Sequence, residues 1–163
     1  MSAVSGAERP AFFEAVEEAS KKAIWCALAT VANNEARVRM VHPTWEGDVL
    51  WIATGPSTAK AREIQENSSV DIQFQVAPDD FVHLLVRGTA SIHTDQATKD
   101  WFYPACAAVN IPTPGKLQDA FAQMMDTERR LVIEVVPEKW ITFDATKMMM
   151  ASIPAWKKLG LID

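Results

Sequence analysis

The feature that most constrains the fold of this chain is a series of short apolar runs, alternating with a period of two and separated by turn residues. In Val70–Val76 the apolar side chains fall on one face and an aspartate and two glutamines on the other, which is typical of a half-buried strand. Arg37–His42 and Val49–Thr54 are similar runs. No strand–helix–strand repeat with glycine-rich turns occurs, which disfavours a doubly wound parallel sheet. We therefore predict a mainly β chain, an antiparallel barrel of six or seven strands with a few short helices.

Three details refine this prediction. Ile24–Val31 (IWCALATV) is apolar at odd and even positions alike, so we expect a strand buried on both faces. Gly88 lies inside the long run Phe81–His93, where glycine indicates a bulge or a bend. Leu131–Val136 and Trp140–Phe143 are separated by a proline-containing turn, and we expect them to form a closing hairpin.

Helical spacing predicts an N-terminal helix in residues 1–22, a helix over Ser57–Asn67 and another over Lys116–Met125. Asn33-Asn34 predicts a hairpin turn, because asparagine tolerates positive φ. The whole chain, residues 1–163, is expected to form one domain. The tail, residues 145–163, is unusually apolar for a terminus, and we expect it to be buried against a second copy in a homodimer.

Composition excludes several classes of protein. The net charge of −5 argues against a general nucleic-acid or anionic-membrane surface. No apolar stretch approaches the length of a membrane span, and the first residues lack the features of a signal peptide, so a cytoplasmic location is expected. Cys26 and Cys106 fit no metal or redox spacing and are expected to be buried, reduced thiols.

One stretch favours an anion site. Arg37 and Arg39 lie two residues apart on a predicted strand, so their guanidinium groups share a face. The predicted helix that follows begins with Ser57 and Thr58 and carries Lys60 in its first turn, where the helix dipole favours acidic residues. A bound phosphate would account for both features. The alternatives are a solvated strand face for the arginines and an ordinary surface position for the lysine.

Residues of protein-based catalysis are not recognisable. The three histidines are not spaced as metal ligands, no serine lies in a nucleophile-elbow motif, and Gly115-Lys116 lacks the upstream glycine of a phosphate-binding loop. We therefore predict no catalytic side chain and no metal site, and any redox chemistry would come from a cofactor.

Taken together, the motifs resemble those of the flavin-binding split barrels related to pyridoxamine 5′-phosphate oxidase, particularly the general stress protein branch. The resemblance covers about Ile24 to Asp144 and rests on these pieces in order: CALATV, ARVRMVHP, LWIAT-x-x-S-x-x-K-A-x-x-I, V-x-I-x-F, LLVRGTASI and LVIEVVPEKWITFD. It implies an antiparallel Greek-key split β-barrel that binds FMN, in a homodimer with two flavins at the subunit interface.

The resemblance also implies a set of cofactor-binding residues. Those that would hold the phosphate are Arg37, Arg39, Ser57, Thr58 and Lys60. Those that would contact the ring are Val38, Met40, Ala53, Thr54 and His83. The Arg-x-His that the oxidases carry after their late tryptophan is missing after Trp140, so the vitamin B6 reaction is not implied.

The resulting hypothesis is an FMN-binding, flavin-dependent oxidoreductase or stress-type redox protein with an unknown small-molecule substrate or electron donor. One alternative keeps the fold but binds a deazaflavin or haem, and haem would need His42, His83 or His93 as axial ligand. Another is a non-enzymatic module that senses flavin or redox state.

Overall fold

The computed structural model describes residues 12–77 and 81–163. Five helices and seven strands are found in this part of the chain. In chain order they are α1 (Phe13–Lys21), β1 (Cys26–Ala32), β2 (Glu35–Val41), β3 (Thr44–Glu46), β4 (Val49–Thr54), α2 (Ala59–Glu66), β5 (Ser69–Ala77), β6 (Val82–His93), α3 (Gln96–Asn110), α4 (Lys116–Met125), β7 (Leu131–Asp144) and α5 (Ala145–Lys158).

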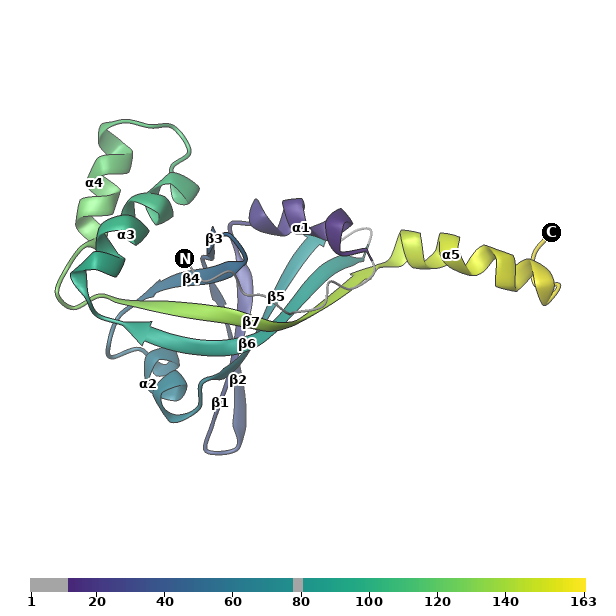
Figure 1. The fold of residues 1–163 in the computed structure, drawn as a ribbon, viewed down its shortest axis with the longest axis horizontal. Helices are drawn as coiled ribbons and strands as arrows, with labels where there is room; N and C mark the ends of the chain where they lie inside the picture. The colour runs from purple at the N-terminus through teal and green to yellow at the C-terminus, as the bar shows by residue number, and fades with distance from the viewer. Residues whose placement is uncertain (1–11, 78–80) are drawn as a thin grey trace.

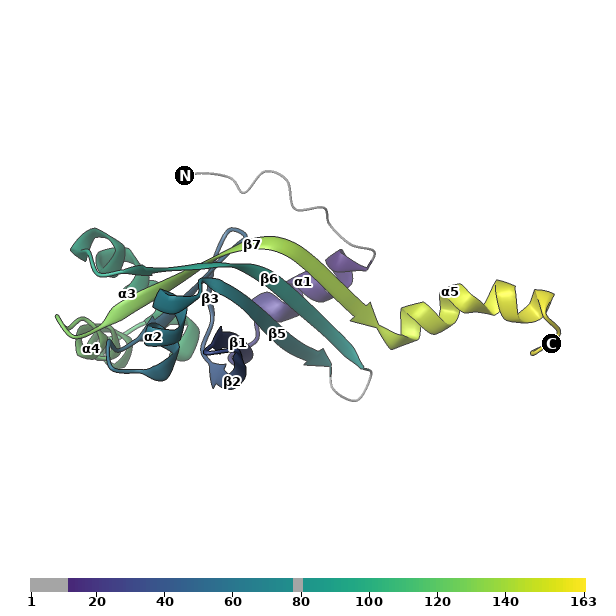
Figure 2. The ribbon, with the colours of Figure 1, turned by 90° about the horizontal axis from the view of Figure 1, so that it is seen from below.

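The strands form one antiparallel sheet in the order β2-β1-β5-β6-β7-β4-β3. The mainly β, antiparallel prediction is confirmed. Helices α1 to α4 lie around the sheet, while α5 extends away from it beyond the end of β7 (Figures 1 and 2). Within the described residues the sheet does not close into a barrel. Its edge strands β2 and β3 each pair with one neighbour, β1 and β4, and not with each other. The sheet is nevertheless strongly curled. Trp45 on β3 stacks on Phe74 of β5, with ring centroids 5.4 Å apart, although three strands separate them in the sheet order.

The inner face of the sheet surrounds one apolar core. Every strand from β1 to β7 except the short β3 sends fully or nearly fully buried side chains into it, and Trp45 of β3 packs against it. Helix α1 closes one opening through Phe13 and Val16, and Phe13 meets Trp140 edge-on at 5.0 Å. The predicted start of this helix near Pro10 and the predicted turn at residues 78–80 lie outside the described residues.

The predicted closing hairpin is wrong, because Leu131–Asp144 is a single strand, β7. Gly88 of β6 pairs with Pro137 while Arg87 pairs with Lys139, so one extra residue bulges from β7. The expected irregularity at Gly88 is therefore confirmed. A Cβ atom at Gly88 would lie only 2.3 Å from the carbonyl oxygen of Val136, so glycine lets the strand pass a proline without turning back.

Strand β1 is buried on one face only, contrary to the sequence-based expectation. Cys26, Leu28 and the other even-numbered residues point into the core, while the opposite face is open in a single chain. The registry places this open face of β1 next to that of β2. We call it the β1–β2 patch. Its members are Trp25, Ala27, Ala29, Val31, Ala36, Val38 and Met40.

The other local predictions mostly hold. Asn33 and Asn34 both have positive φ, 53° and 59°, at the β1–β2 turn. Helix α4 has the predicted bounds. Helix α2 is shorter than predicted and is capped by Thr58 rather than Ser57, with no side-chain capping hydrogen bond. The tail forms helix α5, whose first turn is capped by the Asp144 carboxylate accepting from the Lys147 N–H.

Candidate functional site

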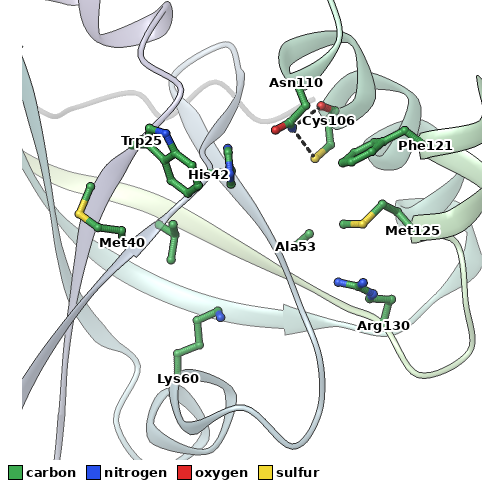
Figure 3. Close-up of a pocket in the computed structure, with 11 residues that line it drawn as sticks. Trp25, Met40, His42, Ala53, Lys60, Cys106, Asn110, Phe121, Met125 and Arg130 are labelled. Carbon is green, nitrogen blue, oxygen red and sulfur yellow. Dashed lines mark hydrogen bonds between the residues drawn. The ribbon is translucent and has the colours of Figure 1, made fainter. Parts of the chain in front are cut away.

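A cavity of about 360 Å³ lies where the ends of β1, β2 and β4 approach helices α2, α3 and α4. Such a volume is within the range of small-molecule sites. Eleven residues line it: Trp25, Met40, Val41, His42, Ala53, Lys60, Cys106, Asn110, Phe121, Met125 and Arg130. Figure 3 shows Lys60 and Arg130 on one side of the cavity and Trp25, His42, Asn110 and Cys106 opposite them.

The apolar side of the cavity is built from distant parts of the chain. Trp25 precedes β1 and stacks on His42, with ring centroids 3.5 Å apart. Cys106 from α3 and Phe121 and Met125 from α4 form the facing wall. Burial lowers the pKa of His42, which favours the neutral imidazole, and its buried Nδ1 atom has no hydrogen-bond partner among the described residues.

The cationic side of the cavity consists of Lys60 and Arg130. Among the described residues neither side chain has a carboxylate within salt-bridge distance. Burial lowers the pKa of Lys60, and the positive charges of Arg39 and Arg130 lower it further. Two half-buried cations that are close enough to disfavour each other's charge would both gain from a bound anion.

Arg37 and Arg39 differ from this pair because a carboxylate already holds them. Glu63 of α2 is 6% exposed and contacts the Nη2 atom of Arg39 at 2.7 Å and the Nε atom of Arg37 at 3.4 Å. The Thr30 hydroxyl donates to Glu63 and accepts from Arg39. This hydroxyl is the main cause that lowers the pKa of Glu63, and the two guanidinium groups lower it further. Arg37 has a second carboxylate partner, because the exposed Glu35 lies 2.5 Å from its Nη2 atom. The two guanidinium charges are thus matched by two carboxylates.

The start of α2 is ordered by hydroxyl contacts. The Thr58 hydroxyl donates to the carbonyl of Gly55 at 2.9 Å and lies 2.8 Å from the hydroxyl oxygen of Thr54. Ser57 is exposed, and its carbonyl accepts from Arg62 at 2.7 Å. With no acidic residue in the first turn, this helix N-terminus keeps the positive end of its dipole uncompensated.

The structure therefore separates the predicted site residues into groups. Met40, Ala53 and Lys60 line the cavity together. Thr54, Ser57 and Thr58 are not among the lining residues but lie in the segment between Ala53 and Lys60, which are. Arg37 and Arg39 contact Glu63. Val38 points outward and is 68% exposed.

His83 is not brought to this cavity within one chain. It stacks on Phe143 at 5.2 Å, near the end of β7 from which α5 leaves. The cavity residue Ala53 pairs with Val132 of β7, and Val132 pairs with His93 of β6. His83 therefore lies ten residues along β6 from the position level with the cavity. Ten residues of extended strand correspond to about 33 Å.

Several residues that line the cavity could not be predicted as site residues from the sequence. Arg130 directly precedes β7, and Asn110, Phe121 and Met125 belong to helices more than 50 residues beyond Ala53. Cys26 and Cys106 are free and buried as predicted. Cys106 additionally faces the cavity, where Asn110 donates to its carbonyl at 2.8 Å and to its sulfur at 3.6 Å, while burial raises the pKa of its thiol.

The described residues contain neither a metal-ligand cluster nor a membrane-spanning helix. No cluster of three or more histidine, cysteine, aspartate or glutamate side chains is arranged to hold a metal ion in this part of the chain. Nor does any helix of residues 12–77 and 81–163 have the length and apolarity to cross a bilayer.

The curled antiparallel sheet thus carries at its rim a cavity with one apolar and one cationic side. The sequence matches the pyridoxamine 5′-phosphate oxidase family over residues 12–144, and the chain belongs to that family. No curated protein matches the chain by sequence.

Solved structures with the same fold carry varied names. General Stress Protein 26 from Bacillus anthracis is 19% identical, with a TM-score of 0.62 over 80% of this chain and 92% of that one. A pyridoxamine 5′-phosphate oxidase-related, FMN-binding protein from Nostoc punctiforme is 15% identical, with a TM-score of 0.59 over 85% and 87%. An F420 reductase is 24% identical, with a TM-score of 0.60 over 77% and 94%. At these identities the likeness concerns the fold.

Proposed function

We propose that the chain binds FMN in this cavity and acts as a flavin-dependent oxidoreductase or stress-type redox protein of the cytoplasm. The observation that carries the proposal is the pair Lys60 and Arg130, which faces an otherwise largely apolar cavity and has no carboxylate partner in residues 12–77 and 81–163. FMN combines a planar apolar ring with a phosphate, and the two sides of the cavity match these two parts. When bound, FMN supplies electron or hydride transfer, which the protein side chains do not.

The residues of the chain would bind and orient the cofactor. Lys60, with the hydroxyls of Ser57 and Thr58, would hold the phosphate at the start of α2. Arg37 and Arg39 would contribute guanidinium N–H donors to the phosphate, although Glu35 and Glu63 already pair with their charges. Backbone groups of Val38, Met40 and Ala53 would hold the edge of the ring, and Thr54 would support this contact through its hydroxyl.

We further propose a homodimer, because two observations need a second copy. The β1–β2 patch exposes Trp25, Val38 and Met40 by 53%, 68% and 60%, although the uncovered face of an antiparallel sheet is normally polar. His83, the remaining predicted ring contact, would reach a cavity only from a partner subunit.

Titration of purified protein with FMN and with riboflavin tests the proposal. We expect FMN fluorescence to be quenched with saturable affinity, and Lys60→Gln to weaken FMN binding while leaving riboflavin binding unchanged. Lys116→Gln, at the exposed start of α4, is the matched control and should leave both affinities unchanged. Protein that neither carries a flavin spectrum nor quenches added FMN would refute the proposal.

A deazaflavin is the second candidate, favoured by the structural similarity to an F420 reductase and by the two unpaired cations, which also suit an acidic tail. Competition between FMN and F420 decides between them. Haem remains testable in the same assay, since His42 alone of the three predicted ligands lines the cavity. Bound flavin that neither NADH nor NADPH reduces, without turnover of any acceptor, would indicate a non-enzymatic flavin-binding or redox-sensing module.

A further inference from the structure

Helix α5 is the largest feature that the proposed flavin site leaves unexplained. The family match ends at Asp144, and α5 begins at the next residue. The helix projects away from the rest of the molecule in both views (Figures 1 and 2). Not one of its residues is buried, and Met148, Met149 and Met150 are between 47% and 60% exposed.

An isolated helix of this kind is not expected to be stable. Helices of about 12–15 residues are marginal in water even with favourable sequences. Pro154 lies inside α5, where it removes one backbone hydrogen bond and collides with the preceding turn. The helix therefore needs a surface that covers it.

Helix α5 has an apolar stripe, with two of its three lysines on the opposite face and Lys157 beside the stripe. Met149, Ile153 and Trp156 follow the i, i+4, i+7 spacing and form one apolar stripe. Lys147 and Lys158 lie on the other side of the helix. Three lysines and one aspartate give residues 145–163 a formal charge of +2, and because the whole chain carries −5, residues 1–144 carry −7.

The β1–β2 patch has the size and character to accept this stripe. No member of the patch is charged, and three of its seven members are alanines, which leaves room for a helix between the larger side chains at its ends. From Trp25 to Val31 the patch is about 20 Å long at 3.3 Å per residue. The 14 residues of α5 span about 21 Å at 1.5 Å per residue.

We propose that α5 of one subunit lies along the β1–β2 patch of the other, in a reciprocal exchange. In a two-fold dimer both copies give and receive one helix, so the contact closes and no filament forms. Trp25 and Met40 belong to the patch and also line the cavity, so the partner's helix borders the mouth of the cofactor site. The inference rests on the dimer of the proposed function, but FMN binding is measured independently of it.

Photocross-linking tests the position of the helix. A benzophenone amino acid replaces Met149, and unlabelled protein is mixed with ¹⁵N-labelled protein before irradiation. We expect cross-links to the segment 24–40 that join labelled with unlabelled chains. The same group in place of Met150, which lies off the apolar stripe, should cross-link to that segment several-fold less.

A pair of conservative substitutions tests the energetics. We expect Met149→Gln to raise the dimer dissociation constant about tenfold or more, because the residue is buried twice in each dimer. Met150→Gln should change it less than threefold, although Met150 is somewhat more exposed in one chain than Met149, 60% against 50%. FMN titration at protein concentrations where all variants are dimeric separates this result from the proposed flavin site.

Three outcomes would overturn the proposal. Cross-links between the two α5 helices would assign the stripe to a different contact. Protein that is monomeric at all concentrations would remove the receiving subunit, whether or not FMN binds. Co-sedimentation with phosphatidylcholine–phosphatidylserine vesicles that Met149→Gln abolishes, without cross-links to residues 24–40, would make α5 a membrane-surface helix.

Discussion

Two groups of basic side chains lie close to helix α2, and they differ in what surrounds them. Arg37 and Arg39 share the buried carboxylate of Glu63. Arg39 also donates to the hydroxyl of Thr30, and Arg37 also pairs with Glu35. Lys60 and Arg130 face the cavity with no carboxylate within salt-bridge distance in the described part of the chain. A positive side chain therefore indicates an anion-binding site only when no carboxylate of the protein pairs with it. We expect the arginines to act mainly on folding and the cavity cations mainly on binding.

The largest expected effect is that of Lys60→Gln on FMN affinity. Loss of one hydrogen bond to a charged group costs about 1.5–3 kcal/mol, which corresponds to roughly a 10- to 150-fold weaker affinity. Unfolding by urea should be almost unchanged, because Lys60 makes no salt bridge with the part of the chain that the structure describes. A mutant that binds FMN normally would place the phosphate away from the cavity cations.

Glu63→Gln should show the opposite behaviour. At neutral pH we expect a loss of about 1–3 kcal/mol in the free energy of unfolding, because Arg39 loses its carboxylate and Arg37 keeps only the exposed Glu35. FMN affinity should change less than in Lys60→Gln. Urea denaturation followed by circular dichroism measures the first quantity.

The same substitution has a defined pH dependence. The pKa of Glu63 is lowered in the folded protein, so its contribution to stability is complete above the unfolded pKa of about 4.3 and is lost as the pH falls through the folded value. Wild type and Glu63→Gln should therefore converge in stability at acid pH. A difference that persists there would mean that the hydrogen-bond geometry, and not the charge, is responsible.

Arg130→Gln is expected to have an intermediate effect. Arg130 is half-buried and shares the cavity with Lys60, so its removal should weaken FMN about three- to tenfold through the lost charge. Arg129→Gln, at the neighbouring exposed position, is the matched control. Equal effects of the two substitutions would indicate a general electrostatic field in place of a contact.

The smallest expected effect is the alkaline weakening of FMN binding. Burial and the nearby Arg39 and Arg130 lower the pKa of Lys60, and the charged form that binds phosphate is lost as the pH rises through this lowered value. FMN affinity should therefore decline at a lower pH than the ordinary lysine value of about 10.4. Riboflavin affinity and the Lys60→Gln variant should not show this decline.

The strands and the position of Lys60 could be predicted from the sequence for local reasons. Alternating polarity records which face of a strand is buried, and the β5 segment shows it directly. A lysine in the first turn of a helix conflicts with the helix dipole, and that conflict is visible without any structure. The expected ligand and the remaining contacts of Lys60 stay predictions that the experiments above test.

Other features depended on pairings between distant residues. Glu63 and Arg39 are 24 positions apart, and their ion pair forms only because α2 packs beside β1, which pairs with β2. Pro137 indicated a turn, but the missing Cβ at Gly88 lets β7 continue past it. The apolar outer face of β1 predicted burial, and in a single chain it is open.

The sequence by itself thus determined a mainly antiparallel β chain, a glycine-dependent bulge, two buried thiols and the family to which the chain belongs, because periodicity, backbone restrictions and local motifs act over a few residues. Only the tertiary structure decided which cations are paired, which side chains from α3, α4 and the start of β7 complete the cavity, and that α5 leaves the fold uncovered. These depend on contacts between segments tens of residues apart, and such contacts leave no periodic trace in the chain.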